Sequence, residues 1–564
     1  MSIPRNALIG YVVQSPSPNI SQVAADTPIP IGSYVYARFD IRSKVSGEYK
    51  VREVVGLVTN TAYQPVIPQS TLALISETDP DKIRGPSYSP VNIYVIADVT
   101  EGEATPPIYP IPPNTPIYLA EAVSPNPLER IYRRSDPSNR LIRIGSLARY
   151  MDQEVAIDAN RLYKHLLITG ATGSGKSNAV AIIVDRLSSQ GAPVIIFDVH
   201  GEYRGLEPED GRKDKVVVID AMINPLRIRL DMLARIAIPE AAATKQRRIF
   251  KRIIRNLKNE LYKKAREEKT DLKIAIDKLL NHRSNSRSGS RLKELLQEIY
   301  ELEEEEADQK ISRLSHEEKL SLLILNKIEQ MCENKRDKDV CENLHDKLVD
   351  FFNSYRIISL EASSPVDRLS PGRIIVYDVS GLSDDQKSWL LKTLVEDLLD
   401  HLKETYRIKG SAELPVVLVI EEAPLFISRD RASVASESIR RFAREGRKFG
   451  GVLVISSQRP RVLDPDISSQ IQNYLFLKLV QEDDIRSVMN IADYLEENLA
   501  RTLTSLPTGW GLVMGEWIGR FPALVAIDRH LGKKLGASPD LVGSWRGALE
   551  SSERRKETPQ EFEF

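Results

Sequence analysis

The segment from Gly170 to Ser177 reads Gly-Ala-Thr-Gly-Ser-Gly-Lys-Ser and constrains this chain more than any other stretch. It fills every position of G-x-x-x-x-G-K-[ST], between an apolar run at 165–169 and a helical apolar pattern at 177–189. Glycines allow the unusual φ values and the close approach by which backbone N–H groups surround a polyphosphate. The N-terminus of the following helix adds partial positive charge. This order of elements predicts that the chain binds a nucleoside triphosphate.

The loop also predicts individual contacts. Lys176 reaches the outer phosphates, and the Ser177 hydroxyl binds Mg²⁺. A GTPase is disfavoured, because NKIE at 326–329 differs from the NKxD that recognises guanine and lies in a charged helical region. The motif therefore predicts a nucleoside triphosphate with Mg²⁺, and the family resemblance described below implies that the nucleotide is ATP. The predicted nucleotide-binding residues are Gly170, Ala171, Thr172, Gly173, Ser174, Gly175, Lys176, Ser177 and Asn178.

Length and composition bound the remaining possibilities. The 564 residues suffice for several domains of about 150 residues each. The formal net charge of −1 means that any nucleic-acid contact must come from a local patch. Cys332 and Cys341 lack the companions of a metal site, and we expect free thiols in a reducing cytosol. No apolar run reaches the roughly 18 residues of a membrane span, and the N-terminus lacks a signal-peptide pattern. A soluble, cytoplasmic protein without a membrane partner is expected.

The pattern along the chain predicts five segments. Short runs rich in Val, Ile and Tyr over residues 1–100 favour a small barrel or sandwich, with 143–150 as its last strand. The Pro-dense stretch 105–116 favours a stiff linker over a binding motif. The predicted division is 1–150 for the small β domain with its linker, 151–235 and 356–535 for the two parts of the nucleotide-binding core, 236–355 for a charged helical insertion, and 536–564 for a partly disordered C-terminal extension.

The insertion contains an unusually basic segment. Residues 245–269 carry eleven basic and three acidic side chains in a helical pattern, and 301–308 is strongly acidic. Charge runs usually mark a solvated helix face, and we favour that interpretation. The alternative is that 245–269 contacts DNA phosphates.

Apolar runs that alternate with helical patterns in the core predict a mostly parallel sheet covered on both faces. Ligands of such sheets gather at the carboxyl ends of the strands. Polar residues at or near these ends are therefore expected to form one site, and they are Ser177, Asp198, Glu202, Glu421, Glu422 and Gln458.

Cleavage of a γ-phosphate needs charge neutralisation, an oriented water and a base or water-positioning residue. We expect Glu421 beside Mg²⁺, directly or through water, and Glu422 as the residue that polarises the attacking water. Glu202 competes for that second role. We favour Glu422 because adjacency to the magnesium acid fits a strand directly facing the phosphate loop. Gln458 is a candidate γ-phosphate sensor, with an ordinary polar cap as the equal alternative.

Basic residues outside the loop are further candidates. Arg447, or its neighbour Arg444, follows a basic helix and is a candidate for completing the site of an adjacent subunit, with surface ion pairs as the alternative. Lys164 is a possible additional site residue, although it and His200 are more often structural.

These motifs together resemble the HerA family of the HerA/FtsK group of DNA translocases. The segments that carry the resemblance are IGYVVQ (9–14), RIGSL (143–147), KHLLITGATGSGKSN (164–178), IFDVHGEY (196–203), NPL (224–226), VIEEAPLFIS (419–428), AREGRKFG (443–450), SSQRP (456–460) and LGASPDLVGSW (535–545). The sequence departs from the family at Pro424, where histidine is usual, and at Lys164, commonly arginine, which has a bidentate fork that lysine lacks.

The resemblance implies a fold and a function. It implies an α/β, RecA-like P-loop ATPase core with a mostly parallel sheet, a small N-terminal β-barrel and a ring of six identical subunits. It also implies ATP-driven movement on double-stranded DNA, and DNA-end resection and repair with a NurA-like nuclease bound through the barrel. By motif position, Lys176 and Ser177 bind nucleotide and Mg²⁺, Glu422 is catalytic, Gln458 is a sensor, and Arg447 acts in trans.

Two other functions fit a nucleotide-binding core of this kind. One is an ATPase that remodels proteins, and the other is a nucleotide-gated assembly protein that hydrolyses little ATP. No aromatic pore loop that would grip a polypeptide is evident in the sequence.

Overall fold

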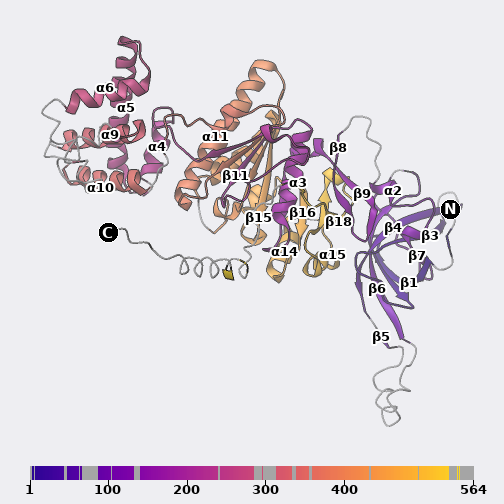
Figure 1. Ribbon diagram of the computed structural model, residues 1–564. Helices are drawn as coiled ribbons and strands as arrows, with labels where there is room; N and C mark the ends of the chain where they lie inside the picture. The colour runs from indigo at the N-terminus through magenta and orange to yellow at the C-terminus, as the bar shows by residue number, and fades with distance from the viewer. Residues whose placement is uncertain are drawn as a thin grey trace, which may run out of the picture.

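Two β-sheets organise the chain in the computed structural model, a seven-stranded sheet near the N-terminus and an eleven-stranded sheet in the core (Figure 1). The structure describes residues 3–4, 7–42, 48–62, 64–65, 87–102, 104–132, 140–238, 240, 242–284, 295, 313–332, 338–354, 358–430, 433–492, 494–532, 543 and 545–546.

The N-terminal sheet closes into a barrel. Its order is β2-β1-β7-β3-β4-β6-β5, and β2 also pairs with β6, so that six strands form a closed ring. The strands are β1 (Leu8–Ser17), β2 (Ile20–Ala25), β3 (Tyr34–Arg42), β4 (Tyr49–Thr61), β5 (Gln64–Pro65), β6 (Ser87–Asp98) and β7 (Pro116–Leu119). Closure removes exposed strand edges, and alternate side chains fill the interior. The predicted barrel is confirmed.

The Pro-dense stretch 105–116 does not link the barrel to the core. It connects β6 to β7, two strands of the same barrel, so the linker interpretation is wrong. Thr105 pairs with Asp98, and the Asn114 N–H donates to the Val12 carbonyl oxygen at 2.8 Å. Prolines lack the N–H of a central ladder strand, which suits a connection that runs between barrel strands.

The strand expected at 143–150 also has a different partner. β8 (Leu141–Leu147) pairs with β18 (Ala523–Ile527) and with β9 (Tyr150–Asp158), and all three belong to the core sheet. This strand therefore does not close the small β domain. Most residues of β8 are buried, and its partner β18 comes from nearly 400 residues downstream, so the pairing is not encoded locally.

The core sheet has the order β12-β13-β11-β14-β15-β10-β16-β17-β18-β8-β9. Pairs from β12 to β16 are parallel and those from β16 to β9 are antiparallel, which confirms a mostly parallel sheet. The remaining strands are β10 (Leu166–Thr169), β11 (Val194–Asp198), β12 (Val216–Asp220), β13 (Ile374–Asp378), β14 (Val416–Ile420), β15 (Gly451–Ser457), β16 (Asn473–Leu477) and β17 (Trp510–Gly515).

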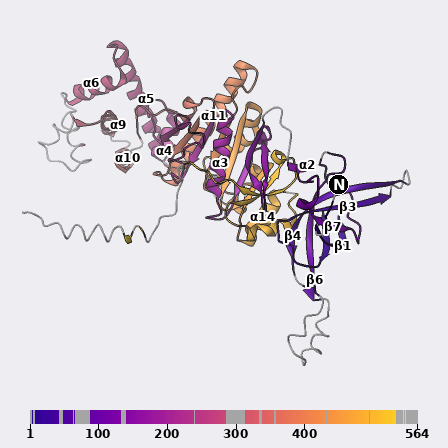
Figure 2. The same cartoon turned by 45° about the vertical axis from the view of Figure 1, so that its right-hand side comes forward.

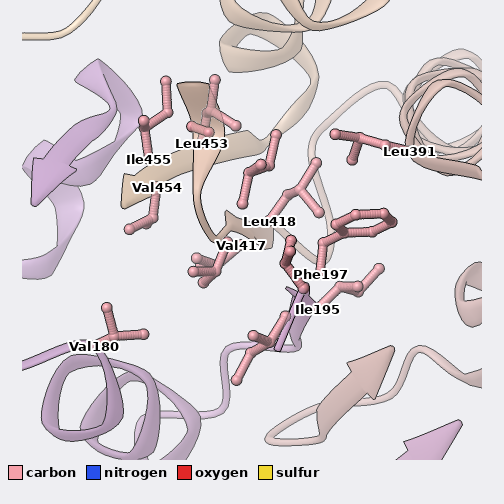
Figure 3. Packing of buried hydrophobic residues seen from close by; sticks show 14 of the residues in the cluster. Val180, Ile195, Phe197, Leu391, Val417, Leu418, Leu453, Val454 and Ile455 are labelled. Atoms are coloured by element: carbon pink, nitrogen blue, oxygen red, sulfur yellow. The ribbon is translucent and has the colours of Figure 1, made fainter. Parts of the chain in front are cut away.

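Helices bury both faces of the parallel strands. Every residue of β10, β11, β13, β14 and β16 is buried. Figure 3 shows Val180 of α3 (Lys176–Ser189) and Leu391 of α11 (Asp384–Lys409) approaching β11 and β14 from different directions. The other described α-helices outside the insertion are α2 (Glu129–Tyr132), α4 (Leu230–Ala237), α12 (Ser436–Glu445), α13 (Pro465–Ser468), α14 (Glu482–Ile491) and α15 (Glu497–Thr502).

The charged insertion forms a helical bundle at the opposite end of the core sheet from the barrel, as Figures 1 and 2 show. Its described helices are α5 (Thr244–Glu267), α6 (Leu272–Ser284), α9 (His316–Cys332) and α10 (Lys338–Ser354). Cys341 is buried as a free thiol. The acidic run 301–308 and the C-terminal residues from 547 lie outside the described residues. Within the described part of the chain, no helix has the length and apolar character needed to cross a bilayer.

Candidate nucleotide-binding site

The phosphate loop joins β10 to α3 and depends on its glycines. Gly173 and Gly175 have left-handed backbones with φ values of 76° and 101°. A Cβ on Gly170 would lie 2.5 Å from the Ser174 Oγ and 2.7 Å from the Leu477 Cβ. Side chains at these three positions would therefore be strained or clash. The loop ends at the first turn of α3, where N–H groups have no intrahelical acceptor and can bind an anion.

Neighbouring strands hold the loop in place. The Ala171 N–H donates to the Lys478 carbonyl at 2.8 Å, and the Gly509 N–H donates to the Ser174 carbonyl at 2.9 Å. The Asn178 side chain donates to the Asp528 carbonyl at 2.8 Å and accepts from the backbone N–H of His530 at 2.9 Å. Asn178 thus anchors the segment after β18 to the start of α3.

Lys176, Glu422 and Gln458 meet at the loop. The Lys176 Nζ lies 3.0 Å from the Glu422 Oε1, and the Gln458 Nε2 donates to the same oxygen at 2.6 Å. The Thr172 hydroxyl donates to the Gln458 Oε1 at 2.7 Å. Glu422 is therefore connected to the phosphate loop in two ways. The Gln458 amide links it to Thr172, and the Lys176 ammonium group links it to the end of the loop.

The strand that carries the two glutamates does not directly face the phosphate loop, contrary to the sequence-based argument. β15 lies between β10 and β14. Glu422 still reaches Lys176 because it follows β14 in a left-handed conformation, with a φ of 42° and a ψ of 46°. Gln458, just beyond the intervening β15, bridges the gap. Such backbone strain in a non-glycine residue is typical of functional sites.

The Glu421 side chain lies in a second, buried cluster that also contains Tyr203, Glu202 and Asp198. Its side chain is 3% exposed, and its Oε1 accepts a 2.7 Å hydrogen bond from the Tyr203 hydroxyl. Burial, with smaller contributions from the charges of Glu202 and Asp198, raises the pKa of the Glu421 carboxyl to about 8. The Ser177 hydroxyl donates to the Glu202 Oε2 at 2.7 Å. Glu202 thus contacts the first turn of α3, while its charge also acts on the buried Glu421.

Asp198 organises the loop after β11. Its carboxylate accepts hydrogen bonds from the backbone N–H groups of His200, Gly201, Glu202 and Tyr203, at 2.8 to 3.3 Å. Burial nevertheless raises its pKa. Asp198 therefore positions Glu202 and Tyr203, and His200 contributes its backbone N–H. Tyr203 escaped sequence reasoning, although the tyrosine of the HGEY segment was a visible signal.

The donor set suits a small hard cation. Among the described residues, no group of three or more His, Cys, Asp or Glu side chains is preassembled as a metal site. The Glu421 Oε2, however, is buried and finds no hydrogen-bond partner in the described part of the molecule. Together with Ser177 and Glu202 it offers oxygen ligands, and Mg²⁺ commonly combines one or two protein carboxylates with substrate phosphates. These residues fit a Mg²⁺ ion bound with a triphosphate.

Three predicted basic residues lie outside this cluster. Arg444 is exposed and pairs with Glu437 at 3.4 Å. Arg447, in the short helix η8 (Gly446–Phe449), is exposed and makes no ion pair with any described residue. Lys164 pairs with Glu516 at 2.9 Å. Within its own chain, none of the three contacts the phosphate loop among the hydrogen bonds and ion pairs described.

A buried histidine connects the two sets of residues. His165 precedes β10 with a left-handed φ of 59°. Its Nδ1 accepts a 3.1 Å hydrogen bond from the Leu453 N–H, so its Nε2 carries the proton and donates to the Ala443 carbonyl at 2.8 Å. Burial lowers the His165 pKa. This side chain ties the phosphate-loop strand to the end of α12, just before Arg444 and Arg447.

A phosphate loop between a parallel strand and a helix, with acids at the carboxyl ends of neighbouring strands, defines a P-loop ATPase. Residues 142–398 match the family described as "Helicase HerA, central domain". The "DNA double-strand break repair helicase HerA" of Sulfurisphaera tokodaii is 31% identical, over 97% of this chain and 98% of its own length. Its namesake from Sulfolobus acidocaldarius is 30% identical, over 96% of this chain and 97% of its own length.

The chain belongs to the HerA family, which confirms the predicted resemblance. Among solved structures, that of VirB4 from Thermoanaerobacter pseudethanolicus aligns with a TM-score of 0.42 at 18% identity. The alignment covers 72% of this chain and 100% of VirB4, at a similarity too low to bear on function.

Proposed function

We propose that this protein is an ATP-driven translocase and helicase that acts on double-stranded DNA. The observation that carries the proposal is the convergence of Lys176, Glu422 and Gln458, three residues from distant parts of the sequence, at the end of one phosphate loop. The names of the full-length relatives, DNA double-strand break repair helicases, support DNA as the substrate.

In this proposal the loop residues Gly170 to Asn178 bind ATP, and Lys176 neutralises the outer phosphates. Ser177 and Glu421, with Glu202 nearby, hold Mg²⁺, directly or through water. The bound ion would neutralise charge on the phosphates. When ATP binds, its phosphates replace Glu422 as the partner of Lys176. The freed Glu422 carboxylate then accepts a proton from the attacking water. Gln458, which touches both Glu422 and Thr172, senses the γ-phosphate.

We infer a homo-hexameric ring in which Arg447 completes the site of the adjacent subunit. The support is geometric: Arg447 is exposed, lies outside its own site, and follows the helix end held by His165. A trans arginine links hydrolysis to assembly. We further propose a cytoplasmic protein that acts in DNA-end resection, with a NurA-like nuclease bound through the barrel, as the family resemblance implies.

The decisive experiment measures the ATPase rate of the full chain with and without linear duplex DNA, for the wild type and Lys176→Ala. We expect duplex DNA to stimulate the wild type and Lys176→Ala to be inactive under both conditions. If DNA does not change the ATPase rate of the wild type, the proposal is contradicted and a protein-remodelling ATPase is favoured. Equal turnover by the wild type and Glu422→Gln would instead favour a nucleotide-gated assembly protein.

A further inference from the structure

The helix α5 has two chemically different faces. Its buried side chains include Phe250, Ile253, Leu257 and Leu261, and it packs against α4, α6, α9 and α10. Exposed basic residues form what we call the basic stripe, which consists of Lys245, Arg248, Arg252, Arg255, Lys263 and Arg266. With about 100° per helical residue, these six positions fall within a sector of about 80° on the face away from the apolar core.

The basic stripe differs from the rest of the insertion in how its charges are compensated. Several lysines elsewhere in the bundle are paired, and the pairs include Lys319–Asp277 at 2.8 Å and Lys327–Glu260 at 3.0 Å. By contrast, Lys245, Arg248, Arg255 and Arg266 make no ion pair with any described residue. Several lysines of the bundle are therefore compensated within the fold, whereas four of the six stripe residues are exposed without an ion pair to any described residue.

This arrangement fits a regularly charged polyanion. α5 holds ten basic and two acidic residues, although the whole chain has a formal net charge of −1. Its 24 residues span about 36 Å, a length over which duplex DNA carries about 20 phosphate charges. Arginine binds phosphate through a bidentate fork. Charge density, length and residue type all match the phosphate backbone.

An acidic protein partner fits less well. Protein interfaces usually centre on exposed apolar or aromatic anchors. Among the described residues of α5, no large hydrophobic side chain is exposed, because the apolar residues face the bundle. The stripe thus offers charge without an apolar centre, which is the character of a surface that contacts a nucleic-acid backbone.

We propose that the basic stripe of α5 binds the phosphate backbone of duplex DNA, as a contact separate from the ATPase core. The insertion lies at the end of the core sheet away from the barrel, so this contact engages the duplex at a distance from the barrel end (Figures 1 and 2). The inference rests on the proposed function in taking DNA as the substrate. It adds a contact that does not require nucleotide.

The test compares two variants of the full chain with equal loss of charge. The stripe variant carries Lys245→Gln, Arg248→Gln, Arg255→Gln and Arg266→Gln. The control variant changes four other exposed basic residues, each in a surface ion pair, and carries Lys213→Gln, Lys338→Gln, Arg407→Gln and Arg486→Gln. Binding of a fluorescent duplex of about 30 base pairs, long enough to exceed the stripe, is measured without nucleotide over a salt series.

We expect the stripe variant to bind the duplex at least about tenfold more weakly at low salt. The slope of log K against log salt should become shallower by about 2 to 4, close to one for each lost phosphate contact. The control should stay within about twofold of wild type, since scattered charges contribute only screened, long-range attraction. ATPase activity without DNA should be unchanged in both variants.

Equal affinity and salt slope in the stripe variant and the wild type would overturn the inference. A change in oligomeric state without a change in DNA affinity would also overturn it, by assigning the stripe to a protein contact. A wild type that neither binds duplex nor responds to it would instead defeat the proposed function. If the fourfold variant unfolds early in a thermal melt, Arg248→Gln with Arg255→Gln should still show a shallower slope than wild type.

Discussion

The nucleotide site and the basic stripe of α5 both carry positive charge that we propose binds phosphate, but the two regions hold that charge in opposite ways. Lys176 is 9% exposed and lies 3.0 Å from Glu422. Arg248 and Arg255 are exposed on one helix face. A buried charge depends on a specific partner, and removal of that partner costs several kcal/mol of stability. Exposed charges each contribute a small interaction energy, these energies add, and salt screens them. In the two proposals, the nucleotide site recognises phosphate through the position of one ammonium group, whereas the basic stripe recognises it through charge density.

The largest effect that would sharpen this contrast is expected for Lys176→Ala. Removal of one buried ammonium should lower ATP turnover by more than about 10⁴-fold, because charge stabilisation supplies most of the catalysis of phosphoryl transfer. Steady-state ATPase assays provide the measurement. The exposed Lys213→Ala is the control and should keep wild-type turnover. Substantial turnover by Lys176→Ala would mean that position matters less in the buried site than we infer.

Arg447→Ala should lower turnover by about 10³-fold, at the lower end of the range for an arginine that acts in trans. Co-assembly of Arg447→Ala subunits with Lys176→Ala subunits should restore part of the activity, because some interfaces combine an intact Lys176 with an intact Arg447. Arg444→Ala, which removes only the exposed pair with Glu437, is the matched control. If mixed rings do not regain activity, Arg447 acts within its own subunit or is only a surface residue.

Glu422→Gln should lower kcat by about 10² to 10³, within the range for loss of a general base, with little change in KM. Glu202→Gln, which keeps a polar side chain near Ser177, should mainly raise the Mg²⁺ concentration needed for activity. ATP and Mg²⁺ titrations of the two variants separate these effects. A larger loss of kcat in Glu202→Gln than in Glu422→Gln would reverse the roles assigned to the two acids.

The smallest expected effect concerns stability. Because the folded-state pKa of Glu421 is raised to about 8, folded protein holds a proton that unfolded protein has lost, and stability falls as pH rises from about 4.5 to about 8. Glu421→Gln cannot ionise, so it should remove this fall in stability with rising pH. Without nucleotide, its melting temperature should exceed that of wild type by several degrees above pH 8, with the difference shrinking towards pH 5. A constant difference across pH would contradict the assigned pKa.

Much of the site was predictable because its components are local. The loop from Gly170 to Ser177 has its own sequence pattern, and apolar runs before Glu421 and Gln458 identify buried strands that end in polar residues. Parallel strands bring such ends to one edge of the sheet. That rule suffices to predict that Lys176 and Glu422 meet, although it does not say how.

Other features could not be predicted from the sequence. The sequence assigned β8 to the small domain, missed β9 and β18, and treated 105–116 as a linker. The errors over β8 and over 105–116 concern which partner a segment meets. The pattern of apolar residues in a strand shows which of its side chains are buried and at what spacing. Which strand it pairs with depends on packing between segments hundreds of residues apart.

By itself, the sequence indicated a nucleotide site, predicted the loop that would hold the phosphates, and identified the acids that stand at strand ends, since glycine geometry and hydrophobic runs act locally. The tertiary structure alone decided that β15 separates β10 from β14, that Glu422 reaches Lys176 from a left-handed turn, and that Glu421 turns towards Tyr203. The physical reason is that adjacent glutamates share nearly the same local sequence, and only long-range packing makes one buried and the other available to the loop.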